Sequence, residues 1–254
     1  IAGNQSDGSG GGLRLYLSNS GNSVSLLNTT VSGNAADNNG GGLYFSTSGG
    51  GNTLAVAHNT ITANTADVDD NGSGDGGGIY VNGDAPEVTN TILSGNSDDT
   101  TLGASAGKAP VEAVHPDCSG SISTAGVNLI GDTTGCAGTF TNDLVGTEYD
   151  ADLKELTKVP GMEISIHDLG LSSDAINAAD PATCAEEDAI GQVRNENACD
   201  IGAVESISLA IALYQQSNGG CTIGSGSAGL ASGMGLLLLA VAGAFAFERR
   251  RRRS

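Results

Sequence analysis

The stretch from Asn28 to Leu43 reads NTTVSGNAADNNGGGL and contains two short motifs that return along the chain. The first motif is an aliphatic residue, two small residues and an asparagine, and it occurs at residues 1–4, 31–34, 61–64 and 93–96. The second is three glycines and an aliphatic residue, and it occurs at residues 10–13, 40–43 and 76–79. The distance from asparagine to first glycine is 6 residues in two copies and 12 in the third, so one loop carries an insertion. A repeat that keeps its register around a loop insertion is a structural unit that stacks on its neighbours.

Within one repeat, the apolar residues alternate with polar ones in short runs, such as residues 13–17 and 24–27, separated by Gly, Asn and Ser. A period of two between turn residues is typical of β-strands, and no repeat shows a helical period. We therefore predict an all-β fold, a parallel β-helix over residues 1–117 with three strands in each coil. The glycine triplets would supply positive φ at one corner. The asparagines of the first motif are predicted to form a hydrogen-bonded ladder at another corner; they are Asn4, Asn34, Asn64 and Asn96.

Composition supports a stacked fold over a conventional core. The 254 residues include 40 Gly, no Trp and only 4% aromatics, so few large side chains exist to fill a single core. Disorder is the alternative reading of such a chain, but disordered chains lack regularly spaced apolar residues. Residues 1–247 carry 5 basic and 28 acidic groups, a net charge of -23. That charge repels phosphate and anionic lipid, so binding to nucleic acid is not expected.

Residues 28–205 resemble bacterial surface proteins described as having a choice-of-anchor Q domain. The coil motifs NTTVSGN, NTITANTA, GGGLYF and GGGIYV carry the likeness, followed by TNTILSGN, PDCSGSISTAGVNLIG, DLVG, DLGLSSDAINAAD and a final CDIGAVE ending at Glu205. The resemblance implies a right-handed parallel β-helix of the pectate-lyase-like superfold, with a C-terminal anchor that varies between members and no particular reaction. The segment DAIGQVR, residues 188–194, departs from the Asp-Gln-Arg-Gly pattern expected there, which leaves the role of its side chains open. We expect residues 118–205 to cap the C-terminal end of the coils, since end coils expose strand edges.

Five cysteines lie at residues 118, 136, 184, 199 and 221, and none forms a Cys-x-x-Cys pair. Two disulfides and one remaining thiol is the simplest arrangement, and it favours an oxidising compartment. Cysteines that flank a short loop can meet without crossing the cap. We therefore predict that Cys118 pairs with Cys136 and that Cys184 pairs with Cys199.

The enzyme alternative is a polysaccharide lyase or a glycoside hydrolase whose active coils precede Ile1, which aligns with Val31 inside a repeat. The resemblance implies that a lyase of this fold would need a basic residue beside a calcium-binding acidic cluster. Residues 1–107 contain a single basic residue, Arg14. Hydrolases need paired carboxylates, one kept protonated by burial, whereas the acids of the repeats lie in Gly/Asn loops where water keeps them ionised. The three histidines lie far apart, and His58 is predicted to be a surface turn residue. No catalytic residue is therefore expected.

The inserted loop, residues 67–75, reads DVDDNGSGD and is the clearest candidate ion site. Oxygen ligands on alternate residues followed by a turn glycine copy the first half of a calcium loop. The candidate ligands are Asp67, Asp69, Asn71 and Asp75. The bidentate Glu expected near Gly78 is absent, so a solvated acidic loop without a bound ion is the alternative.

The C-terminal part is predicted to be an anchor and sorting signal. Residues 206–228 form a linker with Gly219, Gly220 and Cys221 at the processing or modification point, and residues 229–247 carry no charge over 19 positions. A helix of that length extends about 28 Å, which matches the hydrocarbon core of a membrane. The arginine tail, residues 248–254, would stay cytoplasmic. The order of Gly-Gly-Cys, hydrophobic segment and arginine cluster is similar to that of tripartite sorting signals, which implies cleavage by an intramembrane protease or sortase-like enzyme. The alternative is a permanent single membrane span.

These observations predict a non-catalytic protein of the bacterial cell envelope, on its extracytoplasmic face. Its role would be structural or adhesive, with a carbohydrate or a surface protein as the candidate ligand. Its other partners would be the membrane, through the C-terminal helix, and the sorting enzyme. Calcium is the candidate cofactor.

Overall fold

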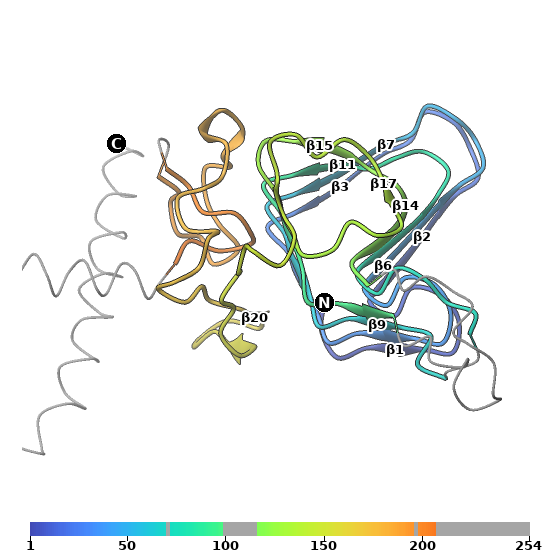
Figure 1. Ribbon diagram of the computed structural model, residues 1–254, viewed down its shortest axis with the longest axis horizontal. Coiled ribbons are helices and arrows are strands. Elements are labelled where there is room, and N and C mark those ends of the chain that lie inside the picture. Colours follow the sequence, from blue (N-terminus) through green and yellow to red (C-terminus); the bar gives the residue numbers. More distant parts are fainter. Residues whose placement is uncertain (70–71, 99–115, 196–197, 207–254) are drawn as a thin grey trace, which may run out of the picture. The chain divides into compact units, whose positions relative to one another are not determined.

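The computed structural model describes residues 1–69, 72–98, 116–195 and 198–206 (Figure 1). The described chain is all-β; its only helical element is a single 3-10 turn, η1 (Pro181–Thr183). Successive coils stack so that equivalent strands pair in parallel. The observed architecture is therefore β-helix-like, as the repeats predict.

Each full coil contributes one strand to each of four parallel sheets, which we number in chain order. Sheet 1 contains β1 (Gln5–Ser6), β5 (Ala35–Ala36), β9 (Thr65–Ala66) and β13 (Ser97–Asp98). Sheet 2 contains β2 (Leu13–Leu17), β6 (Leu43–Thr47), β10 (Ile79–Asn82), β14 (Cys118–Ser121) and β17 (Cys136–Ala137). Sheet 3 contains β3 (Ser23–Leu27), β7 (Thr53–Ala57), β11 (Glu87–Thr89) and β15 (Ser123–Ala125). Sheet 4 contains β4 (Thr30–Ser32), β8 (Thr60–Thr62), β12 (Ile92–Leu93), β16 (Leu129–Ile130) and β18 (Leu144–Val145).

The number of strands differs from the sequence prediction of three in each coil. The additional strand is the two-residue member of sheet 1, as in Gln5–Ser6 and Ala35–Ala36. Two residues are too few to show an alternating pattern, so periodicity could not reveal this strand.

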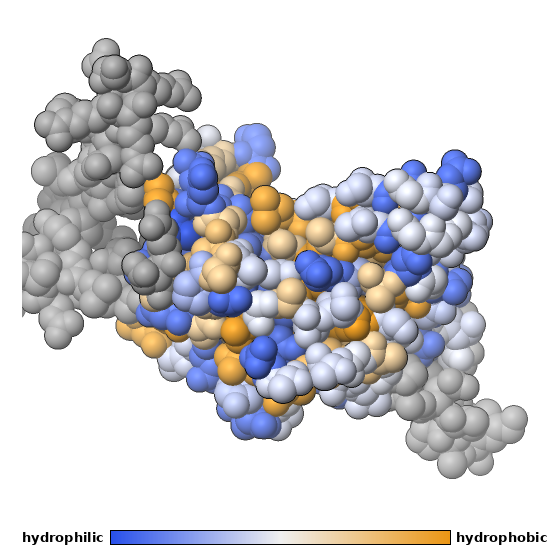
Figure 2. All heavy atoms as spheres, turned by 90° about the horizontal axis from the view of Figure 1, so that it is seen from above, coloured by the Kyte–Doolittle hydropathy of each residue, from blue (hydrophilic) through white to orange (hydrophobic). Residues whose placement is uncertain are grey.

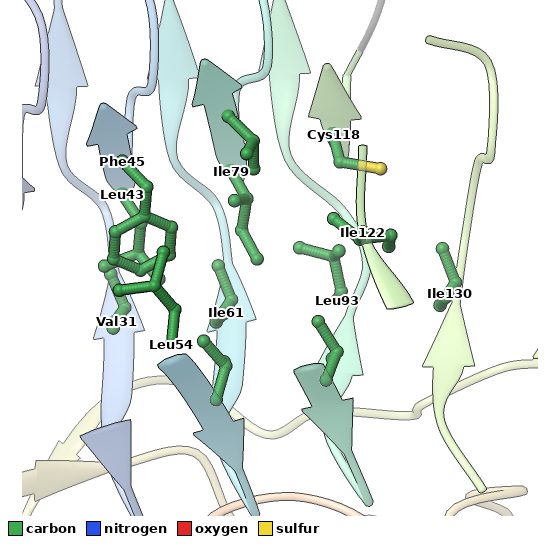
Figure 3. Packing of buried hydrophobic residues seen from close by; sticks show 13 residues of the cluster. Val31, Leu43, Phe45, Leu54, Ile61, Ile79, Leu93, Cys118, Ile122 and Ile130 are labelled. Carbon is green, nitrogen blue, oxygen red and sulfur yellow. The ribbon is translucent and has the colours of Figure 1, made fainter. Parts of the chain in front are cut away.

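The interior is a set of aliphatic columns that run along the stack (Figure 3). In sheet 4, Val31 pairs with Ile61, Ile61 with Leu93, and Leu93 with Ile130, so four equivalent side chains lie in one row. All four are fully buried. Burying one such side chain stabilises the fold by about 1.5–3 kcal/mol, so each coil gains its stability mainly from the coils on either side.

The motif asparagines form the ladder that the sequence predicts. The side-chain Nδ2 of each donates to the Oδ1 of the next, at 2.9 Å from Asn4 to Asn34, 2.8 Å from Asn34 to Asn64 and 2.9 Å from Asn64 to Asn96. Each asparagine also donates its backbone N–H to the same Oδ1. The ladder continues into Asp117, whose Oδ1 accepts from Asn96 at 2.8 Å.

Two further polar ladders run along other corners, and both also end at an aspartate. One passes from Asn22 through Asn52 to Asp84. The other includes Thr91 and Asn128, and ends at Asp143. An aspartate suits the end of a ladder because both of its oxygens accept hydrogen bonds, so no amide N–H is left over.

The glycine triplets allow neighbouring coils to approach closely. A Cβ placed on Gly41 would lie 2.4 Å from the carbonyl carbon of Thr65, and one on Gly77 would lie 2.0 Å from the carbonyl oxygen of Ser97. Any side chain at either position would push the coils apart. The middle glycine of the triplet is therefore required by contact between coils, in addition to the positive φ of the first glycine, which is +71° at Gly40.

The coils continue beyond the predicted boundary at residue 117. Strands β14 to β18 join the same parallel sheets and extend the stack to Val145. The last coil is short, because Leu144 pairs with Leu129 only 15 residues earlier. Its residues Cys136, Phe140 and Val145 pack against the core cluster. This short coil, which lacks the asparagine and glycine motifs, therefore covers the C-terminal end of the interior.

Residues 146–195 and 198–206, here called the lateral module, pack against the outer face of sheet 4 (Figure 1). Ile92 and Leu129 of sheet 4 share a buried cluster with module residues including Leu169, Ala175 and Ile201. This placement differs from the prediction that residues 118–205 cap the end of the coils. The reason is that sheet 4 carries apolar residues on both faces, so its outer face also needs a cover. Within the module, β19 (Thr157–Lys158) and β20 (Ser165–Ile166) form an antiparallel pair.

The structure contains two disulfides, Cys118–Cys136 and Cys184–Cys199, which are the pairs that the sequence predicts. The first joins β14 to β17 within sheet 2, and the second lies inside the lateral module. Closing loops of this length stabilises by about 3 kcal/mol in the chain-entropy model.

No helix long and apolar enough to cross a membrane is present in the described part of the chain. The predicted span, residues 229–247, lies outside the described residues. So do the arginine tail, Gly219, Gly220 and Cys221.

Candidate functional site

An aromatic column lies on the outer face of sheet 2. Alternation along β6 sends Leu43 and Phe45 into the core and leaves Tyr44 outside. Parallel register then places Arg14 beside Tyr44 in the preceding coil, and Tyr80 beside it in the following coil. The rings of Tyr44 and Tyr80 are parallel, with centroids 5.3 Å apart and an interplanar angle of 3°. The Arg14 guanidinium carbon lies 5.3 Å from the Tyr44 ring centroid, within the range of a cation–π contact.

The column is flanked by a closely packed glycine corner and by an exposed tyrosine. A Cβ on Gly40 would lie 2.5 Å from the Leu43 carbonyl oxygen and 3.0 Å from the Tyr44 Cβ, so the backbone is closely packed at this corner and no larger residue fits there. Tyr16, on the same strand as Arg14, is 62% exposed. Figure 2 shows one face of the molecule, on which hydrophilic and hydrophobic residues are interspersed over the described part of the chain. The column is therefore a local feature in which two aromatic rings and a guanidinium lie in register on the outside of sheet 2.

The Tyr80 hydroxyl is a neutral phenol at neutral pH, because the pKa of this group lies above its ordinary value of 10.0. Partial burial raises the pKa of Tyr80, and the nearby Tyr44 and Asp75 raise it further. A neutral phenol both donates and accepts hydrogen bonds. The column can thus offer a flat apolar face and a polar rim to a ligand, while Arg14 occupies the opposite end.

The sequence contained the signal for this column, because LRLYL, LYFST and IYVN occupy the same place in three repeats. Sequence reasoning considered Arg14 only as a candidate base and overlooked both tyrosines. In the structure, the Arg14 guanidinium instead lies over the ring of Tyr44.

The predicted calcium loop is only partly described. Asp67 is fully buried in the left-handed region, at φ +53°, and its Oδ2 accepts a hydrogen bond from the Gly72 N–H at 3.0 Å. The Asp75 N–H donates to Asn39 at 2.9 Å, and Asn71 lies outside the described residues. Within the described ranges, no group of three or more His, Cys, Asp or Glu side chains is arranged to hold a metal ion.

Acidic side chains of successive coils repel one another near this loop. Desolvation raises the pKa of Asp37, and the charges of Asp69 and Asp7 raise it further. These three residues follow the stack, one from each coil. A cation beside these carboxylates would reduce their repulsion. The calcium site in this loop therefore stays a prediction, and the repulsion gives a physical reason for it.

His58 lies at a coil corner as predicted, but it is buried and not at the surface. Its side chain is 1% exposed, and its Nε2 lies 3.0 Å from the Thr183 carbonyl oxygen and 3.2 Å from the Ala185 backbone nitrogen. Burial lowers the pKa of His58 to about 4, and the charge of Arg194 contributes in the same direction. The reason for the burial is the lateral module, which covers this corner.

A seam of polar side chains joins the corners of the coils to the lateral module. Asn28, His58 and Asn90 occupy equivalent corners with φ of +50°, +51° and +47°, and each one bonds to the module. Farther along the contact, Ser32 Oγ lies 2.8 Å from His167 Nε2. Both are buried within the interface, so this pair holds the two parts together.

The segment DAIGQVR has a structural role in the module. Arg194 is 2% exposed, donates to Glu205 at 2.8 Å and to the Gly202 carbonyl at 2.8 Å, and reaches Asn28 at 3.2 Å. Asp188 accepts three backbone N–H bonds, including one from Glu205. Burial raises the pKa of Asp188 and Glu205. The side chains that the sequence left without a role therefore organise the core of the module.

No family model, curated protein or solved structure matches the chain in the three comparisons.

Proposed function

We propose that this protein is a non-catalytic surface module of the bacterial envelope, structural or adhesive in role, that presents sheet 2 to a ligand. The observation that carries the proposal is the ordered column of Arg14, Tyr44 and Tyr80 on the outside of a rigid stack. Rings fixed in register by backbone pairing lose little conformational entropy on binding. The two disulfides support an oxidising, extracytoplasmic location.

The proposed anchor is the C-terminal segment. We assign a right-handed sense to the coils and an anchor to residues 229–247 from the resemblance to choice-of-anchor proteins and from the uncharged length of that segment. Gly219, Gly220 and Cys221 would then be the processing point for a sorting protease or sortase-like enzyme. The membrane and that enzyme are the partners in this proposal.

Expression of the whole chain in a bacterial host tests the location. We expect protease added to intact cells to digest the coils and the lateral module. We also expect both cysteine pairs to be oxidised to disulfides. Mass spectrometry of the surface-extracted protein then reports the anchor: a C-terminus near Cys221 supports cleavage, and a C-terminus at Ser254 supports a permanent span. A protein protected inside the cell with reduced cysteines would contradict the proposal.

A glycan array scored both for binding and for product release tests the function. We expect retention of the protein on the array without release of shortened sugars. Release of unsaturated or hydrolysed products would identify an enzyme instead.

A further inference from the structure

We propose that the outward ring face of Tyr80, above Ser119, is a stacking site for one sugar ring of a neutral polysaccharide. The proposal rests on the adhesive function above and names the ligand class and the position of its site. It concerns only the described residues of sheet 2.

The aromatic column ends at Tyr80 while the sheet continues. Tyr80 pairs in register with Ser119 of the next coil, so the position that would extend the stack holds a small hydroxyl side chain. Strands in a sheet lie about 4.8 Å apart, close to the 5.3 Å between the ring centroids of Tyr44 and Tyr80, so the next ring position of the column falls over Ser119. The side chain of Ser119 therefore leaves a ring-sized step above the Tyr80 face.

The opposite end of the column is already occupied. The Arg14 guanidinium lies over Tyr44, and the second face of Tyr44 is covered by Tyr80. Of the faces in this column, the Tyr80 face toward Ser119 is the one without an aromatic or cationic neighbour in register. The geometry thus points to one stacking position and not to several.

The chemistry of the surroundings selects a neutral sugar. A pyranose ring combines an apolar face of C–H groups, which suits an aromatic ring, with hydroxyls around its edge. Asn82, exposed two residues along β10, and the Ser119 hydroxyl provide polar partners for such an edge. Burial and the neighbouring Tyr44 raise the pKa of the Tyr80 phenol, and the negative charge of Asp75 contributes in the same direction. Residues 1–247 carry a net charge of -23. An acidic sugar would be repelled.

Isothermal titration calorimetry of the chain of residues 1–254 in mild detergent tests this site. The probes are cellohexaose, xylohexaose and mannohexaose, with hexagalacturonate as the acidic comparison. We expect at least one neutral probe to bind, and Tyr80→Ala to weaken its affinity tenfold or more. Tyr80→Phe keeps the ring and should stay within threefold of the parent protein.

Two further variants separate the site from folding defects and from other tyrosines. Ser119→Tyr fills the step with a third ring and should also weaken binding tenfold or more. Tyr149→Ala removes a 37% exposed tyrosine of the lateral module and should leave binding unchanged. Circular dichroism melting confirms that each variant is folded.

The proposal is overturned if none of the neutral probes binds, if hexagalacturonate binds more tightly than all of them, or if both Tyr80→Ala and Ser119→Tyr bind as the parent does. Surface location, measured separately by protease access, distinguishes these failures from failure of the adhesive function.

Discussion

Asn96 donates both its backbone N–H and its side-chain amide to the same oxygen of Asp117, at 3.1 and 2.8 Å. The second oxygen of Asp117 accepts the backbone N–H of Asp132 at 2.8 Å. The carboxylate is 2% exposed. A ladder of neutral amides therefore ends on a buried group that can carry a charge.

This buried end should make stability depend on pH. Burial raises the pKa of Asp117 from 3.8 to about 6, although the hydrogen bonds from Asn96 act in the opposite direction. The folded state then binds the proton more tightly than the unfolded state, so the stability gained from protonation is present below about pH 4. This stability is lost as the pH rises to about 6, and the total loss is about 3 kcal/mol. Asp117→Asn should remove this dependence, as measured by urea unfolding at pH 4 to 7.

Asp84 provides a matched control with the opposite sign. It also ends a ladder, but hydrogen bonds from the Asn52 side chain and backbone lower its pKa. The Asp84 carboxylate therefore contributes to the free energy of unfolding at a pH above the ordinary pKa of an aspartate. This contribution is lost as the pH falls through the lowered pKa of Asp84. Asp84→Asn should reduce the loss of stability in acid and leave the change between pH 4 and 6 intact. If the free energy of unfolding depends on pH in the same way for both variants and the parent protein, this account is contradicted.

Substituting an asparagine in the middle of the ladder should reduce the free energy of unfolding far more than substituting one at its end. Asn64 is fully buried, accepts from Asn34 and donates both to Asn96 Oδ1 and to the Val31 carbonyl. Asn64→Ala leaves several of these groups buried without partners, each costing about 1–3 kcal/mol. We expect a loss of about 3 kcal/mol or more in the free energy of unfolding.

Asn4→Ala is the control for that loss, because Asn4 is exposed at the first coil and its groups can bond to water. Its cost should stay below about 1 kcal/mol. Equal destabilisation of the two variants in chemical denaturation would show that the ladder is not cooperative.

Arg194 should hold the lateral module together. Arg194→Met leaves the Glu205 carboxylate buried without its partner, a change that costs about 3–5 kcal/mol in comparable sites. Hydrogen exchange should show faster exchange in residues 146–206 and little change in the coils. The control is Lys158→Met, which removes an exposed ion pair with Glu163 and should cost less than about 1 kcal/mol. Uniform acceleration across the coils would mean that the module and the stack unfold together.

The coil interior could be predicted from the sequence because its determinants are local and repeated. Val31, Ile61 and Leu93 occur at the same place in successive repeats, and stacking follows from that spacing. The asparagine ladder follows for the same reason. Each repeat predicts its neighbours without knowledge of distant contacts.

The lateral module could not be placed because its contacts link residues far apart in the chain, such as Thr60 and Ala203. One signal was nevertheless present. Ile92-Leu93 and Leu129-Ile130 are adjacent apolar pairs in strands, and adjacent apolar residues point to opposite faces. Such pairs indicate a sheet that is buried on both sides. The sequence therefore indicates that some segment covers the outer face of sheet 4, but it does not indicate which segment.

The tyrosine column was missed for a different reason. Tyr44 and Tyr80 occupy polar positions of an alternating strand, and the alternation was used only to find the interior. A repeated outward residue contributes little to the core, so its repetition indicates contact between coils or with a ligand. Aligning the outward positions as well as the inward ones would have revealed it.

Calcium should stabilise the folded protein through the acidic loop. Desolvation raises the pKa of Asp37 in the folded state, and repulsion by the charges of Asp69 and Asp7 raises it further. For a site with a dissociation constant of about 1 mM, typical of weak extracellular sites, 10 mM calcium adds about 1.4 kcal/mol. The melting temperature measured by circular dichroism should therefore rise in calcium.

The comparison with magnesium decides whether that rise comes from a site or from screening. Magnesium carries the same charge but gives up its water reluctantly, so a site built from loop oxygens should favour calcium. Asp69→Asn should abolish the calcium effect. Asp67→Asn is less informative, because its carboxylate also accepts the Gly72 N–H that closes the loop. Equal increases with both ions would contradict a calcium site and leave the solvated acidic loop, whose repulsion any divalent cation reduces.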